Sequence, residues 1–214
     1  MSATSNSVPD TRRIKLYAVS IFAVVLLMLM ALDTKVVTLS ELESEVGFSP
    51  EQFAQDSFSD IREYIEANAV EASILAHEAL QSPGDAGEQY GIASGIGHVI
   101  PVSVTGTAIE QQAGIYTLEV EGVSDEVVVR VQMGPAINGT VLRDTTGNIQ
   151  FSDFTNQIEY QDAGAALNEE MKRQVLTGVS TQDLIGQTLS ITGSFNMINP
   201  QNWLITPVNV VVDE

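Results

Sequence analysis

The sequence predicts an α+β protein, in which an N-terminal hydrophobic helix precedes a helical hairpin and a small five-stranded β-domain. Three observations support this prediction. One long apolar run lies near the N-terminus, and hydrophobic residues recur at helical spacing between residues 50 and 80. From residue 98 onward the hydrophobic period changes to two, which is typical of half-buried strands.

The apolar run LYAVSIFAVVLLMLMAL, residues 16–32, lies at the lower limit of length for crossing a bilayer. Basic residues within 12–15 precede it, so the positive-inside rule puts residues 1–15 in the cytoplasm and the remainder outside. A cleavable signal peptide begins similarly, but this run ends in ALDTKVV, without the small residues of a cleavage site. We therefore expect residues 16–34 to be a retained single-pass anchor in the bacterial inner membrane, with cleavage as the alternative.

The composition excludes several classes of function. Residues 36–214 carry 5 basic and 26 acidic side chains, a net charge of −21. Such a surface repels phosphate backbones, because nucleic-acid binding depends on Lys and Arg, so we expect no nucleic-acid partner. The chain contains no Cys, which excludes disulfides, thiolate metal sites, Cys nucleophiles and attachment of a lipid to Cys.

A first helix is predicted to begin at Ser49-Pro50-Glu51-Gln52. Ser49 can cap the helix, Pro50 suits its first position, and Gln52 completes a capping box. The side chains that share the predicted buried face are Phe58, Ile61 and Ile65.

A second helix is predicted over residues 69–80, and together the two would form a helical hairpin within residues 35–97. Its predicted buried stripe contains Val70, Ile74 and Leu75. Residues 82–97 are rich in Gly, Ala and Ser, so we expect them to form the boundary before a β-domain over residues 98–214.

Five strands are predicted in the β-domain. Alternating hydrophobic residues place three of them near residues 100–104, 116–120 and 127–133, and two more at 189–197 and 203–212, the last with a change of phase at Pro207. Between the third and fourth strands, residues 144–148 predict a tight hairpin. A helix is expected within residues 155–176, with Leu167, Met171 and Val175 on one stripe.

The order of three strands, a helix and two strands is that of a five-stranded Greek-key barrel of the OB type. We therefore predict an OB-like antiparallel barrel with a helix between strands 3 and 4. A simple antiparallel α+β sandwich is the alternative.

Residues that could carry catalysis are sparse. The two histidines, His77 and His98, lie on separate predicted elements, and the glycine-rich GIASGIG lacks the Lys and Ser/Thr of a phosphate-binding loop. We expect no catalytic residues, no metal and no cofactor.

The densest group of polar residues lies between residues 134 and 161. Amides and carboxylates beside an aromatic ring suit binding of a sugar or a backbone edge. The alternative is an internal network in which Arg143 pairs with an acid. The candidate binding residues are Asn138, Arg143, Asp144, Asn156, Gln157, Glu159, Tyr160 and Trp203.

The same segment carries a resemblance to a known family. The run GPAINGTVLRDTTGNIQFSDFTNQIEYQDAGAALN closely resembles the signature of an uncharacterised bacterial family of predicted periplasmic lipoproteins, and SPEQFAQDSFSDIREYIEANAVEA and GSFNMINPQNWLITPV also resemble it. Members tend to be encoded beside ribose-type sugar ABC transporters, which implies a role beside a solute uptake system. Without Cys there is no lipobox, so the hydrophobic segment would provide the tether.

These features predict a membrane-anchored periplasmic accessory or binding protein, not an enzyme, associated with a sugar ABC permease or its solute-binding protein. The alternative is a sugar-processing enzyme that uses carboxylates such as Asp144 and Glu159 as acid and base. An OB-type nucleic-acid binder is disfavoured by the acidic charge, because fold alone does not fix function.

Overall fold

A computed structural model describes residues 21–22, 24–30, 47–179 and 183–213. The chain forms two compact units, Met1–Gly47 and Phe48–Glu214, and each is described by itself. In the first unit, residues 21–22 and 24–30 are helical and expose their apolar side chains. None of the helices among the described residues combines the length and apolarity needed to cross a membrane. The rest of the expected anchor, residues 16–34, lies outside the described residues.

Helix α3 (Pro50–Asn68) begins where the sequence predicts. Ser49 Oγ accepts a hydrogen bond from the Gln52 amide at 3.4 Å. The Gln52 side chain donates to Asp56 at 2.8 Å instead of returning to Ser49, so only half of the expected capping box forms. The buried side chains are Ala54, Phe58, Ile61 and Ile65, which confirms the predicted face.

The second predicted helix is partly wrong. Residues Val70–Glu71 form a short strand, β1, because Val70 pairs in parallel with Val102 of a longer strand. Helix α4 therefore begins later, at Ala72–Gln81, and Ile74 is exposed instead of buried. The side chains that α4 buries are Ala72, Leu75, Ala76 and Ala79.

The Gly-, Ala- and Ser-rich stretch after α4 is not simply a linker. It contains a third helix, α5 (Pro83–Tyr90), and a two-residue strand, β2 (Ile92–Ala93). Pro83 occupies the first turn of α5 and Asp85 is acidic there, both of which favour a helix start. Phe48–Glu214 forms one compact unit by its contacts, and whether residues 35–97 and 98–214 are separate domains stays a prediction.

The predicted order of three long strands, a helix and two long strands is confirmed. The long strands are β3 (His98–Gln112), β4 (Ile115–Val120), β5 (Val128–Gln132), β6 (Thr188–Met197) and β7 (Asn202–Asp213). With β1 and β2 the sheet has seven strands instead of five. Pairing runs β3–β4–β5–β7–β6, and β6 also pairs with β3, so the long strands form a closed ring of pairings.

One pair in this ring departs from the antiparallel prediction. β5 and β7 are parallel, with Val129 opposite Trp203, because the helices and β6 intervene between them as a long crossover. The phase change predicted at Pro207 is real. Between β6 and β7 the register shifts, so that Gly193 faces Pro207 while Thr192 faces Asn209, and Val208 is an extra buried residue.

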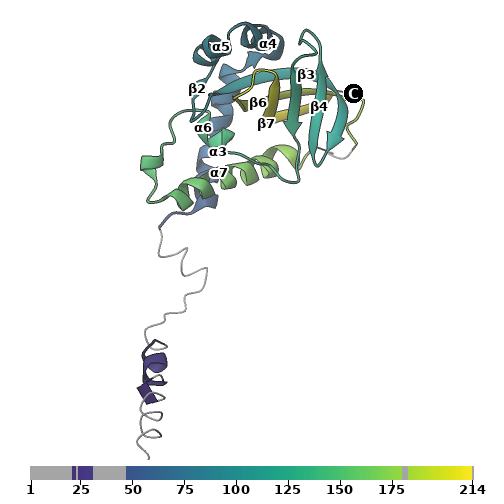
Figure 1. Ribbon diagram of the computed structural model, residues 1–214. Helices are drawn as coiled ribbons and strands as arrows, with labels where there is room; N and C mark the ends of the chain where they lie inside the picture. The colour runs from purple at the N-terminus through teal and green to yellow at the C-terminus, as the bar shows by residue number, and fades with distance from the viewer. Residues whose placement is uncertain (1–20, 23, 31–46, 180–182, 214) are drawn as a thin grey trace, which may run out of the picture. The chain divides into compact units, whose positions relative to one another are not determined.

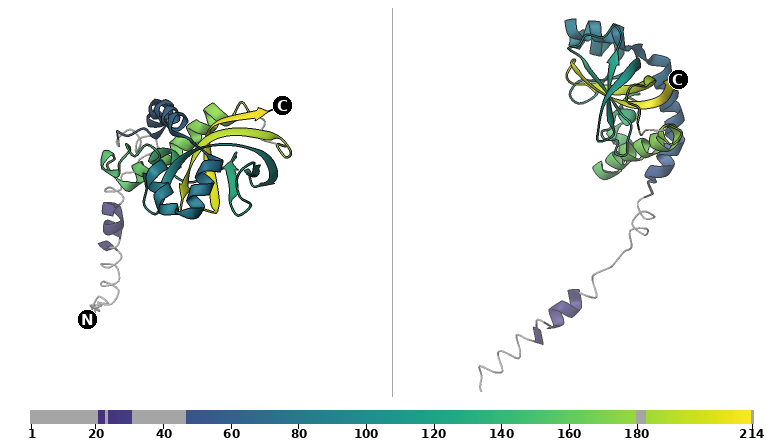
Figure 2. Two further views of the ribbon diagram at one scale, coloured as in Figure 1. Left: turned by 90° about the horizontal axis from the view of Figure 1, so that it is seen from above. Right: turned by 90° about the vertical axis from the view of Figure 1, so that its right-hand side faces the viewer.

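The helices cover the strands from different sides. Helix α3 packs along α7 (Gln157–Met171) and also contacts β3 and β6, whereas α4 and α5 lie together at the other end of the strands (Figures 1 and 2). The fully buried aromatic residues of the core include Phe58, Phe195 and Trp203.

The predicted hairpin at residues 144–148 is wrong. Residues Val141–Asp144 form a helical turn, α6, and Phe151–Asp153 form a short 3-10 helix, η1. The Asp144 and Thr145 amides donate to backbone oxygens four residues earlier, at 3.0 Å each, so these groups are bonded in a helical turn and not between strands.

The helix predicted within residues 155–176 is confirmed. α7 continues into a π-helix, η2 (Lys172–Leu176), and buries Leu167, Met171 and Val175.

Candidate functional site

The centre of the polar segment is an internal network around Arg143. Its side chain is 8% exposed, and Nε donates to Asp144 Oδ1 at 2.8 Å. Nη1 donates to the Tyr160 carbonyl oxygen at 2.8 Å, and Cζ lies 3.5 Å from the Tyr160 ring centroid. The second Asp144 oxygen accepts from Thr140 at 2.7 Å and Ser94 at 3.4 Å. The guanidinium is therefore compensated by charge, backbone and ring within the domain.

The Tyr160 hydroxyl keeps its proton at neutral pH. Burial raises its pKa from the ordinary value of 10.0, and the Asp144 carboxylate raises it further, while the positive charge of Arg143 opposes both effects. Tyr160 therefore acts here as a neutral ring and hydrogen-bonding group.

Gln132, in β5, is a buried polar residue that the sequence analysis missed. Its Nε2 donates to the Asn138 carbonyl oxygen at 3.1 Å and to Thr206 Oγ1 at 3.0 Å. Its Oε1 accepts from the Asn138 amide at 2.9 Å. Asn168 of α7 donates to the Gly139 carbonyl at 2.9 Å. The side chains of Gln132 and Asn168 therefore hold the backbone of the loop at Asn138 and Gly139 in place. An amide directly between the buried Val131 and Met133 was the available signal.

The residues at the start of α7 cap the helix. Asn156 Oδ1 accepts from the amides of Ile158 and Glu159, at 2.9 and 3.0 Å. Glu159 is buried, and its carboxylate accepts from the Thr155 amide at 2.9 Å and from Asn156 Nδ2 at 3.4 Å. Gln157 is exposed on the same turn. Both carboxylates of the suggested acid–base pair, Asp144 and Glu159, are thus engaged by internal donors.

Trp203 lies in the core, away from solvent. Its indole stacks on Phe195 with ring centroids 4.7 Å apart, and Nε1 donates to the Pro200 carbonyl at 2.8 Å. The structure therefore brings Arg143, Asp144 and Tyr160 into direct contact, while Trp203 is occupied in a separate part of the core.

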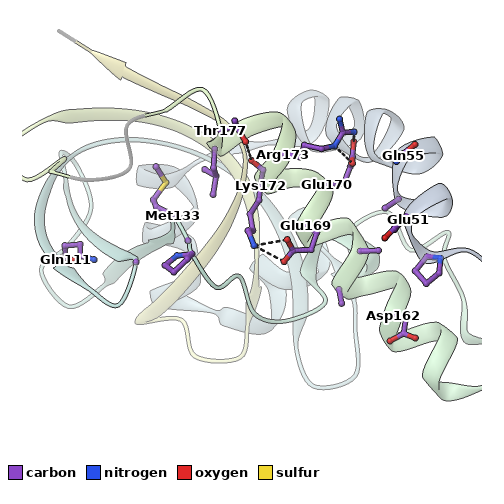
Figure 3. A pocket seen from close by; sticks show the side chains of 18 residues that line it. Glu51, Gln55, Gln111, Met133, Asp162, Glu169, Glu170, Lys172, Arg173 and Thr177 are labelled. Carbon is purple, nitrogen blue, oxygen red and sulfur yellow. Dashed lines mark hydrogen bonds and ion pairs between the residues drawn. The ribbon is translucent and has the colours of Figure 1, made fainter. Parts of the chain in front are cut away.

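An open groove of about 1020 Å³ lies elsewhere, over α7 and η2 (Figure 3). Helix α3 forms one side of the groove, and Gly114 together with residues 133–135 forms the other. Its small and apolar lining residues include Ala54, Met133, Ala165, Ala166 and Leu176, and the polar ones include Glu51, Gln55, Gln111 and Asp162. None of the eight residues predicted from the sequence lines this groove.

Two of the five basic residues of the acidic region lie in the groove. Lys172 donates to Glu169 at 2.8 Å, as expected for a surface pair, and Arg173 pairs with Glu170 (Figure 3). Hydrogen bonds from Arg173 and Gln174 hold the pKa of the Glu170 carboxyl below its ordinary value of 4.5, against the opposing effect of burial. The cations belong to the π-helix, a rare element that is frequent at functional sites.

The far wall of the groove depends on Gly114. Its φ is +81°, and a Cβ there would lie 1.3 Å from the Gly134 carbonyl oxygen, so no other residue fits without moving the backbone. The Met133 amide donates to the Gly114 carbonyl at 2.8 Å, which fixes the start of the loop that follows β5.

The histidines lie apart in separate environments. His77 bonds to Gln81 at 2.7 Å, and the ring of His98 packs over Gly87. Within the described part of the chain, no three His, Asp or Glu side chains are grouped so that they could hold a metal ion.

The fold places the protein among mixed α+β proteins with an OB-like strand order. The chain is similar to the crystal structure of an OB-fold protein from Thermotoga maritima, with a TM-score of 0.61 and 15% identity over 78% of this chain and 99% of that one. At this identity the likeness concerns the fold alone. None of the curated proteins compared with the chain matches it.

The chain belongs to the family described as "Predicted periplasmic lipoprotein (DUF2291)", whose model matches residues 22–211. Membership indicates a periplasmic, membrane-associated location. The residue to which a lipoprotein lipid is attached, Cys, is not among these 214 residues.

Proposed function

We propose that this protein is a membrane-tethered periplasmic accessory of a sugar ABC uptake system, and that it acts by binding instead of catalysis. The groove over α7 and η2 is the surface that contacts the permease or its solute-binding protein. The family resemblance supports the location and the association with solute uptake.

The apolar run at residues 16–32 supports the tether. Because the chain lacks Cys, we attribute its attachment to this hydrophobic segment. The basic residues before the run orient the N-terminus toward the cytoplasm and the domain toward the periplasm.

A contrast in hydrogen bonding carries the proposal for the groove. The polar groups of residues 134–161, the central segment, are bonded within the domain: the Arg143 side chain donates to Asp144, and the Gln132 side chain of β5 bonds the Asn138 backbone. The groove instead opens to solvent over about 1020 Å³. Its exposed Ala165 and charged rim suit a segment of another protein, because small residues allow close approach and paired charges set the orientation.

Purification from membranes tests this proposal. The tagged full-length chain, extracted in mild detergent, should retain the permease of the sugar ABC system or its solute-binding protein. Ala165→Trp fills the floor of the groove and should reduce this retention by about tenfold or more. Gln157→Trp, on the exposed start of the same helix, is the matched control and should retain the partner. Loss of both partners from the wild-type chain would contradict the proposal.

A further inference from the structure

A connected group of aromatic rings lies where the domain begins, and we call it the aromatic base. Its members are Phe48, Phe53, Phe151, Phe154 and Tyr160. Centroids of contacting rings are 5.2 to 5.8 Å apart. The rings belong to the start of α3, to η1 with the residue that follows it, and to the start of α7. Helices α3 and α7 lie side by side (Figure 1).

The aromatic base is fixed from within the domain. The Tyr160 ring lies against the Arg143 guanidinium, which also bonds the Tyr160 backbone at 2.8 Å. Phe154 in turn packs between Tyr160 and Phe48, at 5.3 and 5.2 Å. The internal network of the central segment therefore holds an apolar surface in place.

Two side chains of this end of the domain face solvent. Phe151 is 53% exposed and is the only exposed phenylalanine in the described residues 47–179 and 183–213; Ile158, on the first turn of α7, is 70% exposed. The neighbouring carboxylates of Asp144 and Glu159 are turned inward to internal donors, which leaves Glu51, Asp153 and Asp162 at the margin. An exposed apolar patch with few free charges is typical of an interaction surface.

We propose that the aromatic base rests in the head-group region of the lipid bilayer, with Phe151 and Ile158 inserted. This inference rests on the tether of the proposed function. Phe48, a member of the base, directly follows residues 33–47, which connect it to the apolar run and can span at most about 50 Å. The domain therefore begins, directly after the tether, at the aromatic base.

The tether makes this contact possible with few residues. Once the apolar run is in the membrane, docking of the base is intramolecular, so a weak contact that would fail between free partners becomes populated. Aromatic and aliphatic side chains at the boundary between head groups and acyl chains bind in this manner. The net charge of −21 on residues 36–214 opposes docking on anionic lipids, so salt should strengthen the contact there and leave it unchanged on zwitterionic lipids.

The absence of Cys allows a direct test, because one introduced Cys carries a single dye. The full-length chain with Ile158→Cys, labelled with an environment-sensitive fluorophore, is reconstituted in phosphatidylcholine vesicles with and without phosphatidylglycerol. Val211→Cys, at a position 50% exposed on β7, is the matched control. Brominated lipids should quench the dye at position 158 by about half or more and leave the dye at 211 unchanged.

A second substitution separates docking from folding. Phe151→Ser in the Ile158→Cys chain should remove most of the quenching with an unchanged circular dichroism spectrum, whereas Phe151→Leu should preserve it. Flotation of the same vesicles reports the tether independently. If the chain floats and both dyes behave alike, the docking proposal is overturned while the tether stands. If it does not float, both are overturned. Shielding of position 158 that requires added sugar permease would replace the bilayer with a protein partner and overturn the proposal.

Discussion

The central segment and the groove differ in what their polar groups bind. In the central segment, Arg143, Asp144 and Glu159 are bonded within the domain. In the groove, Lys172 and Arg173 also pair with their neighbours Glu169 and Glu170, but Glu51, Gln55 and Asp162 face an open hollow. The densest run of polar residues in the sequence therefore forms an internal network, whereas the open surface combines residues from several elements that are distant in sequence. The substitutions below test this comparison.

The largest expected effect is that of Arg143→Ala. It leaves Asp144, with its side chain 14% exposed, without its cation, and loss of one partner of a buried pair costs about 3–5 kcal/mol of unfolding free energy. Urea denaturation of the full-length chain measures the change. Lys172→Ala removes a more exposed pair in the groove and should cost less than about 1 kcal/mol. Equal costs would remove the distinction between the two regions.

Gln132→Ala should have the next largest effect. It leaves the backbone groups of Asn138 and the Thr206 hydroxyl without their partner, so we expect a loss of about 2 kcal/mol. Gln111→Ala, on the exposed rim of the groove, should change the stability by less than about 0.5 kcal/mol. A neutral Gln132→Ala would mean that this loop is not fixed by its side-chain hydrogen bonds.

The sequence predicts best those structural features that depend on residues close together in the chain. Alternation predicted the long strands, and Ser49 and Pro50 predicted the start of α3, because these signals act within a few residues. The predicted hairpin at residues 144–148 does not form, because the backbone amides of Asp144 and Thr145 donate to carbonyl oxygens within the helical turn. Val70 was placed in a helix because its strand partner, Val102, is distant in sequence.

The candidate site was harder to predict, for the same reason. The groove combines α3, α7, η2 and residues 133–135, and its floor includes Ala165 and Ala166, which have no distinctive chemistry. Trp203 was assigned to a binding site by residue type, but stacking on Phe195 places it in the core. The sequence does predict, as the alternative to a ligand site, that Arg143 pairs with an acid, since an isolated cation in an acidic region needs compensation, and the structure shows that this acid is Asp144.

The smallest expected effect concerns pH. The lowered pKa of Glu170 means that its carboxylate stabilises the fold above the unfolded-state value near 4.5, and that this contribution is lost as the pH falls through the lower folded-state pKa. Glu170→Gln should lower Tm by about 1–2 °C at pH 7 and by less below pH 4. Thermal unfolding from pH 7 to pH 3 measures this, and an equal decrease at every pH would contradict the stated role.

The most direct test of the central claim compares two exposed positions on α7. A photocrosslinking amino acid replaces either Ala165, in the groove, or Gln157, in the central segment. After irradiation of intact cells, position 165 should give a covalent adduct with the sugar permease or its solute-binding protein, and position 157 should give none. Adducts at 157 but not at 165 would mean that the binding surface lies on the central segment and not in the groove, which would contradict the account.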